Sequence, residues 1–284
     1  MTATFTSNSS HTSKTIQGQS VPAIGFGTFQ IPRDECHESI IEAVEVGYRH
    51  FDTAAVYDNE RIIGQALQEI RIPREELFLS NKIWWEGLTQ NELRTAVDER
   101  LRNLQTEYLD LALMLWPSPN DSIPRAIETL NSLKEQGKIR HLGLSNFTHS
   151  LFQEAARYGT LFTNQIEYNL FHDYRKFAPV YREHGTALTA YSPLNSEEPL
   201  GYPALQKIAS KHGKETEQVA LRWLIEQEGV LAIPRSSKRR YIQTNFNIFD
   251  FSLDEEDYRE LHATCVAQGT PEIPTNDDSV SGQF

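Results

Sequence analysis

"LDLALMLWPSPNDSIPRAIETLNSLKEQGKIRHLGLSN", residues 109–146, holds two short apolar runs on either side of a longer amphipathic segment. The runs at 109–115 and 141–146 have the length and near-continuous hydrophobicity of strands that are buried on both faces. The segment between them, 122–137, has the pattern of an amphipathic helix. Buried strands that alternate with helices are typical of a parallel sheet covered on its outer face.

The same alternation extends over most of the chain. Candidate strands lie at 23–28, 50–54, 77–82, 109–115, 141–146, 163–168, 187–192 and 230–235. Helical patterns lie between them, at 34–47, 59–70, 91–105, 122–137 and 204–213. Eight strand–helix units in 284 residues predict an α/β fold, a (β/α)8 TIM barrel formed by a single domain.

An open, doubly wound sheet is the alternative architecture. It requires a glycine-rich phosphate loop after its first strand, and "GFGTFQ" at 25–30 lacks the third glycine of that pattern. The stretch "KTIQGQSVPAIG" at 14–25 is compatible with a hairpin that closes the bottom of the barrel. We therefore expect a barrel over 15–268, a disordered Ser/Thr-rich tail at 1–14 and a C-terminal tail at 269–284.

Composition narrows the classes of partner. The chain has 27 basic and 39 acidic residues, a net charge of −12, so its overall field does not favour nucleic acid. No apolar run approaches the roughly 18 residues that a membrane span needs. Cys36 and Cys265 lie in no CxxC or Cys/His cluster, which predicts reduced thiols in a cytoplasmic protein and no metal site.

Polar residues occur where the predicted strands end, which in such barrels is the rim that carries the active site. Asp52 ends the second strand, Tyr57 follows it, and Lys82 ends the third. A tyrosine has a pKa of about 10, and a nearby ammonium group lowers it. A carboxylate beside the lysine keeps the lysine charged. Together, Asp52, Tyr57 and Lys82 predict a tyrosine that donates a proton to an alkoxide. The alternative is a surface tyrosine beside a structural Asp–Lys pair.

Seven motifs in order resemble the aldo-keto reductases, above all the short bacterial members that reduce 2,5-diketo-gluconate or methylglyoxal. They are "GYRHFDTAAVYDNERIIGQAL", "LFLSNKIW", "DLALMLWPSPND", "IRHLGLSNF", "TNQIEYN", "TAYSPL" and "IPRSSKRRYIQTNF", within a region from about Ile16 to about Ala267. The resemblance implies a monomeric (β/α)8 barrel that transfers a hydride from NADPH to a small carbonyl substrate and protonates its oxygen from a tyrosine.

Carried over by position, the resemblance implies Tyr57 as the acid, with Lys82 and Asp52 supporting it. Ser145, Asn146 and Gln165 match residues that hold the nicotinamide carboxamide, and their amide and hydroxyl groups suit that task. The full set expected at the cofactor is Thr28, Asp52, Ser145, Asn146, Gln165, Tyr191 (stacked on the nicotinamide), Ser192 and Leu194 (at the pyrophosphate), Ile233, Arg235, Ser236, Ser237 and Asn245 (at the adenine).

The cluster "RSSKRR" at 235–240 is the basic exception in an acidic chain. It is either a solvated loop or a clamp on the 2′-phosphate of NADPH, which arginine binds well. Arg235 stands where the family usually has lysine, and Tyr241 where many members have an arginine against the adenine. We predict NADP(H) rather than NAD(H).

One catalytic position departs from the family. Leu115 occupies the place of the histidine that ends the fourth strand and orients the substrate carbonyl, and leucine donates no hydrogen bond. Three interpretations stay open: a carbonyl reductase with altered activity, a C=C or C=N reductase, or an NADPH-binding sensor with little catalysis. His172 is interpreted as an exposed loop histidine. The expected substrate mouth is aromatic, with Phe29, Trp84, Trp85 and Trp116.

Overall fold

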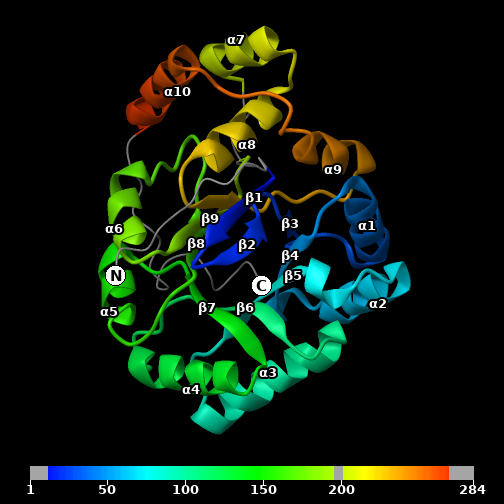
Figure 1. The fold of residues 1–284 in the computed structure, drawn as a ribbon, viewed down its shortest axis with the longest axis vertical. Helices are drawn as coiled ribbons and strands as arrows, with labels where there is room; N and C mark the ends of the chain where they lie inside the picture. The colour runs from blue at the N-terminus through cyan, green and yellow to red at the C-terminus, as the bar shows by residue number, and fades with distance from the viewer. Residues whose placement is uncertain (1–11, 195–200, 269–284) are drawn as a thin grey trace.

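The computed structural model describes residues 12–194 and 201–268, which form a closed barrel of parallel strands ringed by helices (Figure 1). Each strand pairs with the next along the chain, from β3 to β10. A bridge between Ile24 and Ala232 closes the ring, with Gly25 N donating to Ala232 O at 2.8 Å. The predicted fold is confirmed. The strands are β3 (Phe26–Gly27), β4 (His50–Ala54), β5 (Phe78–Trp84), β6 (Leu109–Leu115), β7 (Ile139–Ser145), β8 (Thr163–Glu167), β9 (Ala187–Tyr191) and β10 (Val230–Ala232).

Helices surround the strands and follow them in alternation. Their starts have local causes: the side chain of Thr89 forms a capping box with Glu92 before α3, and Ser122 Oγ accepts from Arg125 N before α4. The helices are α1 (Arg33–Val46), α2 (Glu60–Ile70), α3 (Gln90–Leu104), α4 (Ile123–Glu135), α5 (His149–Ala155), α6 (Ala178–Glu183), α7 (Pro203–His212), α8 (Thr216–Glu226), α9 (Arg239–Phe246) and α10 (Glu255–Gln268). Short 3-10 turns are η1 (Ala55–Tyr57), η2 (Arg74–Glu76) and η3 (Arg175–Phe177).

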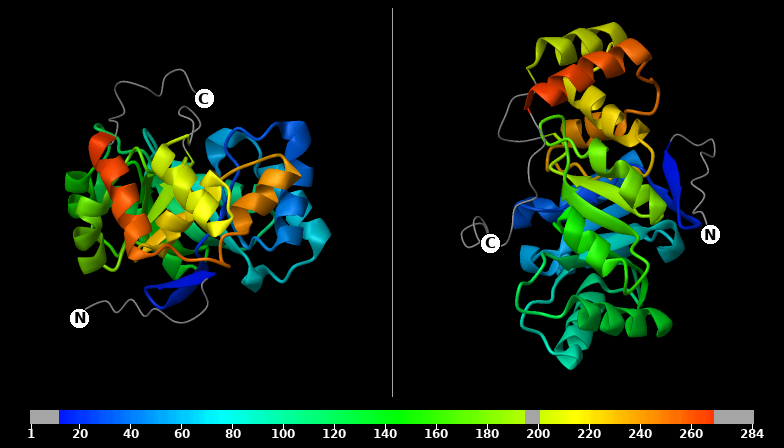
Figure 2. Two further views of the ribbon diagram at one scale, coloured as in Figure 1. Left: turned by 90° about the horizontal axis from the view of Figure 1, so that it is seen from above. Right: turned by 90° about the vertical axis from the view of Figure 1, so that its left-hand side faces the viewer.

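A hairpin of β1 (Ser13–Ile16) and β2 (Gln19–Pro22) lies across one end of the barrel (Figure 2). Its Ile16 and Val21 are fully buried in the cluster inside the barrel, which also contains Phe78, Leu111, Leu113, Phe162, Ala187 and Leu231. The predicted hairpin is therefore present. It begins inside the segment 1–14 that was expected to be a tail, because Ser13 and Lys14 pair with Pro22 and Val21. The rest of that tail, 1–11, and the C-terminal tail, 269–284, lie outside the described residues.

Side chains alternate between the interior of the barrel and the outer layer under the helices. On β6, Leu111 and Leu113 face the interior cluster, whereas Ala112 and Met114 belong to the larger outer core. Gly143 on β7 leaves room for this packing, since a Cβ there would lie 2.7 Å from Leu113 Cδ2. The interior is thus filled at the bottom and middle, which leaves the rim at the strand ends as the place for a site.

Both cysteines, Cys36 and Cys265, are buried and unpaired. No helix of the described part of the chain is long and apolar enough to cross a membrane. Among those residues, no three histidine, cysteine, aspartate or glutamate side chains gather as a potential metal site.

Candidate active site

Asp52, Lys82 and Tyr57 meet at the rim between β4 and β5. Parallel pairing sets Ala54 opposite Lys82, and the side chains of Asp52 and Lys82 form a buried ion pair between Oδ2 and Nζ. The turn η1, which directly follows β4, places the ring of Tyr57 so that its centroid lies 5.1 Å from Lys82 Nζ. The sequence predicted that these three residues lie close together, because neighbouring parallel strands end on the same rim.

The electrostatics of this trio differ in one respect from the prediction. Burial alone would lower the pKa of Lys82, but the Asp52 carboxylate, and Tyr57 with it, raise that pKa above its usual value. Burial raises the pKa of Tyr57, and the opposing pull of the Lys82 ammonium is the smaller effect. The Lys82 ammonium therefore lowers the pKa of Tyr57, as predicted, but desolvation of the phenol raises this pKa by more. The phenol stays protonated at neutral pH, as a proton donor requires.

The other carboxylate oxygen of Asp52 binds side chains from β5 and β8. Its Oδ1 accepts from Ser80 Oγ at 2.6 Å and from Gln165 Nε2 at 2.9 Å. Thr28 Oγ1 donates to the backbone oxygen of Asp52 at 2.9 Å. Sequence reasoning missed Ser80, although it lies two residues before Lys82 and so faces the same side of β5.

A set of amide and hydroxyl groups continues across β7, β8 and β9. Tyr191 OH donates to Asn146 Oδ1 at 2.8 Å, and Asn146 Nδ2 lies 3.3 Å from Ser145 Oγ. Gln165 is 1 % exposed, and its Oε1 has no hydrogen-bond partner among the described residues. The site therefore combines hydroxyl and amide groups with one buried acceptor, and a carboxamide needs both donors and acceptors.

Backbone strain also gathers at this rim. Trp116, Asn146 and Ser192 directly follow β6, β7 and β9, and their φ angles are +55°, +64° and +44°. Positive φ is uncommon for residues other than glycine and often marks functional sites. Here it turns the chain sharply where each strand ends.

Leu115 faces the interior two residues beyond Leu113, paired between Trp84 of β5 and Ser145 of β7. It is 6 % exposed and places an apolar group at the rim. Phe29 is half-buried, with its ring centroid 4.9 Å from that of Tyr57.

Not every expected aromatic residue lines the mouth. Trp84 is half-buried at the end of β5, and Trp116 is 9 % exposed. The expectation for Trp85 is wrong: this residue directly follows β5, is 3 % exposed and packs in the outer core. Its indole Nε1 donates to Trp116 O at 2.7 Å, so it supports the strained turn.

The basic cluster lies between α1 and α9 and is largely paired with acids. Lys238 Nζ lies 3.2 Å from Glu35 Oε1, and Arg239 bonds Glu45 at 3.3 Å. Arg240, at the start of α9, lies 3.1 Å from Glu215 Oε1. Arg235, by contrast, has no carboxylate partner within 12–194 and 201–268, and its Nη2 lies 3.4 Å from Gln30 Oε1.

The remaining predicted cofactor residues belong to the segments that follow β9 and β10 and to α9. Ser192 is exposed, and Leu194 is half-buried against the outer core. Ile233 is 5 % exposed in the chain that continues β10. Ser236 Oγ accepts from Lys238 N at 3.0 Å, Ser237 is half-buried, and Asn245 is buried on α9.

Comparison with known proteins identifies the family of this chain. A sequence profile described as "Aldo/keto reductase family" matches residues 23–265. The chain belongs to the aldo-keto reductase family. It is therefore an oxidoreductase, as the sequence predicted. Methylglyoxal reductase DkgB of Escherichia coli O157:H7 is 38 % identical over 248 residues, which cover 86 % of this chain and 92 % of the relative.

Solved structures agree with this assignment. A putative 2,5-diketo-D-gluconic acid reductase B superposes with a TM-score of 0.84 at 36 % identity, covering 87 % of this chain and 89 % of that one. An aldo-keto reductase of Bombyx mori, determined in complex with NADP, superposes with a TM-score of 0.83 at 27 % identity, covering 93 % and 98 %.

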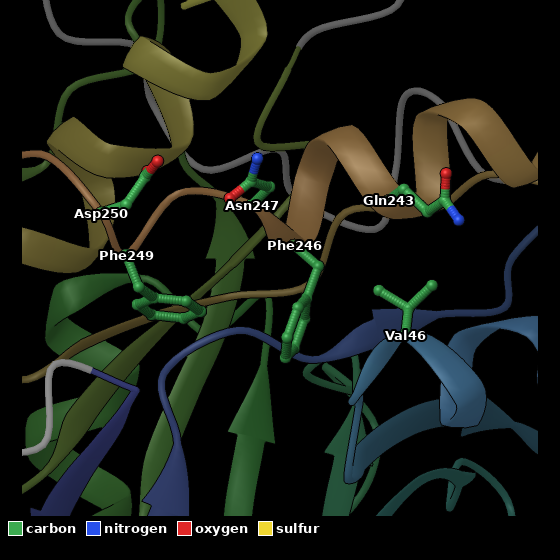
Figure 3. A pocket seen from close by; sticks show the side chains of 6 residues that line it. All are labelled: Val46, Gln243, Phe246, Asn247, Phe249 and Asp250. Carbon is green, nitrogen blue, oxygen red and sulfur yellow. The ribbon is translucent and has the colours of Figure 1, made fainter.

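Two further features of this reductase lie apart from the trio. His172 was expected to be an exposed loop histidine; it is half-buried, and its Nδ1 lies 3.0 Å from Glu167 Oε1. A pocket where α1 and α9 end is lined by Val46, Gln243, Phe246, Asn247, Phe249 and Asp250 and contains none of the predicted site residues (Figure 3).

Proposed function

We propose that this aldo-keto reductase reduces an aldehyde or ketone to the alcohol, with NADPH as hydride donor and Tyr57 as general acid. The observation that carries the proposal is the half-buried Tyr57 ring, whose centroid lies 5.1 Å from Lys82 Nζ of the buried Lys82–Asp52 pair, at the same rim as Ser145, Asn146 and Gln165. When Tyr57 gives its proton to the carbonyl oxygen, the Lys82 ammonium stabilises the phenolate that remains. The pair thus supports Tyr57 as an acid.

The chain's own groups fit NADP(H). The bound cofactor supplies the hydride, and its carboxamide would donate to the orphan Oε1 of Gln165 while accepting from Asn146 and Ser145. We assign Tyr191 to the nicotinamide face, Ser192 and Leu194 to the pyrophosphate, and Asn245 to the adenine. We assign the 2′-phosphate to Arg235 with Ser236 and Ser237, because Arg235 is the cation of this cluster that keeps no carboxylate partner in the described chain.

Small, reactive carbonyl compounds are the proposed substrates. The relative from Escherichia coli is named for methylglyoxal. We assign the substrate mouth to Phe29, whose ring lies beside Tyr57, with Trp84 and Trp116. Leu115 leaves the carbonyl oxygen with Tyr57 as its proposed hydrogen-bond donor. Losing one preorganised donor costs roughly 10²–10³ in rate, so we expect slow but measurable turnover.

A binding module with little catalysis is the second candidate, and Leu115 is the observation that favours it. The buried Asp52–Lys82 pair argues for catalysis, because a module that only binds has no need to desolvate two charges.

The test is NADPH oxidation against α-dicarbonyls, aldehydes, keto sugars and ketones, with Tyr57→Phe as the matched variant. We expect wild-type turnover of at least one class and a loss of about 10²-fold or more in Tyr57→Phe, with the Kd for NADPH unchanged. Equal rates in the two proteins would remove Tyr57 from its role. Tight NADPH binding with no oxidation by any class would favour the binding module.

A further inference from the structure

We propose that Asp52 has a second role: it fixes the side-chain amide of Gln165 in one orientation and so makes the site selective for a nicotinamide whose substituent carries an N–H donor. This inference rests on the proposed use of NADP(H). It makes Asp52 a positioning residue for the cofactor as well as the partner of Lys82.

The first step concerns the two oxygens of Asp52. Oδ2 bonds the Lys82 ammonium, and Oδ1 accepts from both Ser80 Oγ, at 2.6 Å, and Gln165 Nε2, at 2.9 Å. An ionised carboxylate accepts hydrogen bonds and donates none. The NH2 end of Gln165 must therefore face Asp52. The Asp52 carboxylate thus joins Lys82, which supports the proposed acid Tyr57, to the amide of Gln165.

The second step concerns the other end of Gln165. The two ends of an amide have nearly the same shape, so the hydrogen-bond partners decide which way it points. With its NH2 held by Asp52, Gln165 presents Oε1, and this oxygen is buried with no partner among the described residues. A buried acceptor without a donor costs free energy, which a ligand N–H recovers on binding. A carboxamide NH2 supplies that donor, and an acetyl group in its place does not.

The third step predicts what Asp52→Asn does. The introduced side chain is also an amide, and its oxygen faces Lys82, because an NH2 against an ammonium is unfavourable. Its NH2 then faces Gln165, which turns over to accept from it. Gln165 now presents its own NH2 to the ligand, where it opposes the carboxamide NH2 of NADP⁺. The selectivity for the carboxamide should therefore disappear although Gln165 itself is unchanged.

The experiment compares the Kd of NADP⁺ with that of its 3-acetylpyridine analogue by isothermal titration calorimetry. In the wild type we expect NADP⁺ to bind about tenfold more tightly, the worth of one hydrogen bond to a buried acceptor. In Asp52→Asn the ratio should fall to about one or invert. Ser80→Ala is the matched control: it removes the other donor to the same Oδ1 but leaves the carboxylate, so the ratio should persist.

A purely structural role for Asp52 would weaken both ligands alike and leave their ratio unchanged, and that result would overturn the inference. Failure of the wild type to bind NADP⁺ at all would instead overturn the proposed cofactor. A measurement on the wild type covers the case in which Asp52→Asn does not fold. The side-chain NH2 protons of Gln165, assigned in NMR spectra with Gln165→Met, should exchange slowly with solvent without ligand, and fast exchange would contradict the bond to Asp52.

Discussion

Leu115 lies between Trp84 and Ser145, at a rim where the nearby side chains of Ser145, Asn146 and Gln165 are polar and buried. Its neighbours explain why the fold accepts a leucine there. Leu111 and Leu113 precede it on the same face of β6, so Leu115 extends an apolar column by one layer. The residue is unremarkable for stability, and we expect its effect to fall on the proposed chemistry.

We predict that Leu115→His raises turnover of a small aldehyde by about 10²-fold or more, since it adds a donor that orients the carbonyl opposite Tyr57. Steady-state NADPH oxidation measures this gain. The Kd for NADPH should stay constant, because Leu115 is not among the proposed cofactor contacts. An unchanged rate with intact cofactor binding would count against a carbonyl-orienting role for this position.

Whether the sequence predicts a property of a single residue depends on how local that property is. Asp52 and Lys82 end neighbouring strands, so their meeting follows from the strand order. The pKa of Tyr57 does not, because its net direction depends on burial by distant parts of the chain. The bond between Gln165 and Asp52 joins residues 113 positions apart, and only the closed barrel brings them together.

At the scale of elements, α1 and α9 form an acidic and a basic surface in contact. Glu35, Glu42 and Glu45 on α1 meet Lys238 and Arg239 at the start of α9. The sequence revealed the cations but not these partners, which lie about 200 positions away in the chain. These acids would compete with the proposed 2′-phosphate for Lys238 and Arg239, so Arg235 is the main candidate for the clamp.

We predict that Arg235→Ala weakens NADPH binding by roughly 10- to 100-fold, because it removes a charge-assisted contact to the 2′-phosphate. NADH, which lacks that phosphate, should lose little. Glu35→Gln is the companion variant: it releases Lys238, so NADPH should bind a few-fold more tightly while NADH is unchanged. Both constants follow from calorimetry, and equal losses of NADPH and NADH in Arg235→Ala would refute the clamp.

At the scale of the whole molecule, the barrel separates function at its rim from stability at its bottom. The repeated strand–helix pattern was enough to predict this architecture. This pattern overestimated the lengths of the first and last strands, which were expected at 23–28 and 230–235 but are observed as Phe26–Gly27 and Val230–Ala232. These two strands close the ring through a single bridge and a few hydrogen bonds, and such closure is a property of the finished barrel that local patterns do not contain.

The buried side chain of His50 makes the stability of the closed barrel depend on pH. It is 1 % exposed at the bottom of β4, with its ring centroid 4.9 Å from that of Phe78, and a Cβ on Gly25 would lie 2.6 Å from its Nδ1. Burial lowers the pKa of His50 to about 4, with the Lys82 charge adding to this and Asp52 opposing it. Because this pKa lies below the unfolded value of about 6.5, the unfolded chain binds more protons, and stability falls as the pH drops from about 6.5 toward 4.

We predict that this group alone costs about 2 kcal/mol of unfolding free energy between pH 7.5 and pH 5. Urea unfolding at the two pH values measures the loss, and His50→Gln isolates it, because glutamine does not titrate. The variant should be less stable than the wild type at pH 7.5, since glutamine cannot reproduce the ring contact with Phe78. When the pH falls from 7.5 to 5, the unfolding free energy of His50→Gln should decrease by about 2 kcal/mol less than that of the wild type. Identical pH dependence in the two proteins would show that His50 is not held neutral beneath the hairpin and that the acid sensitivity of the barrel arises elsewhere.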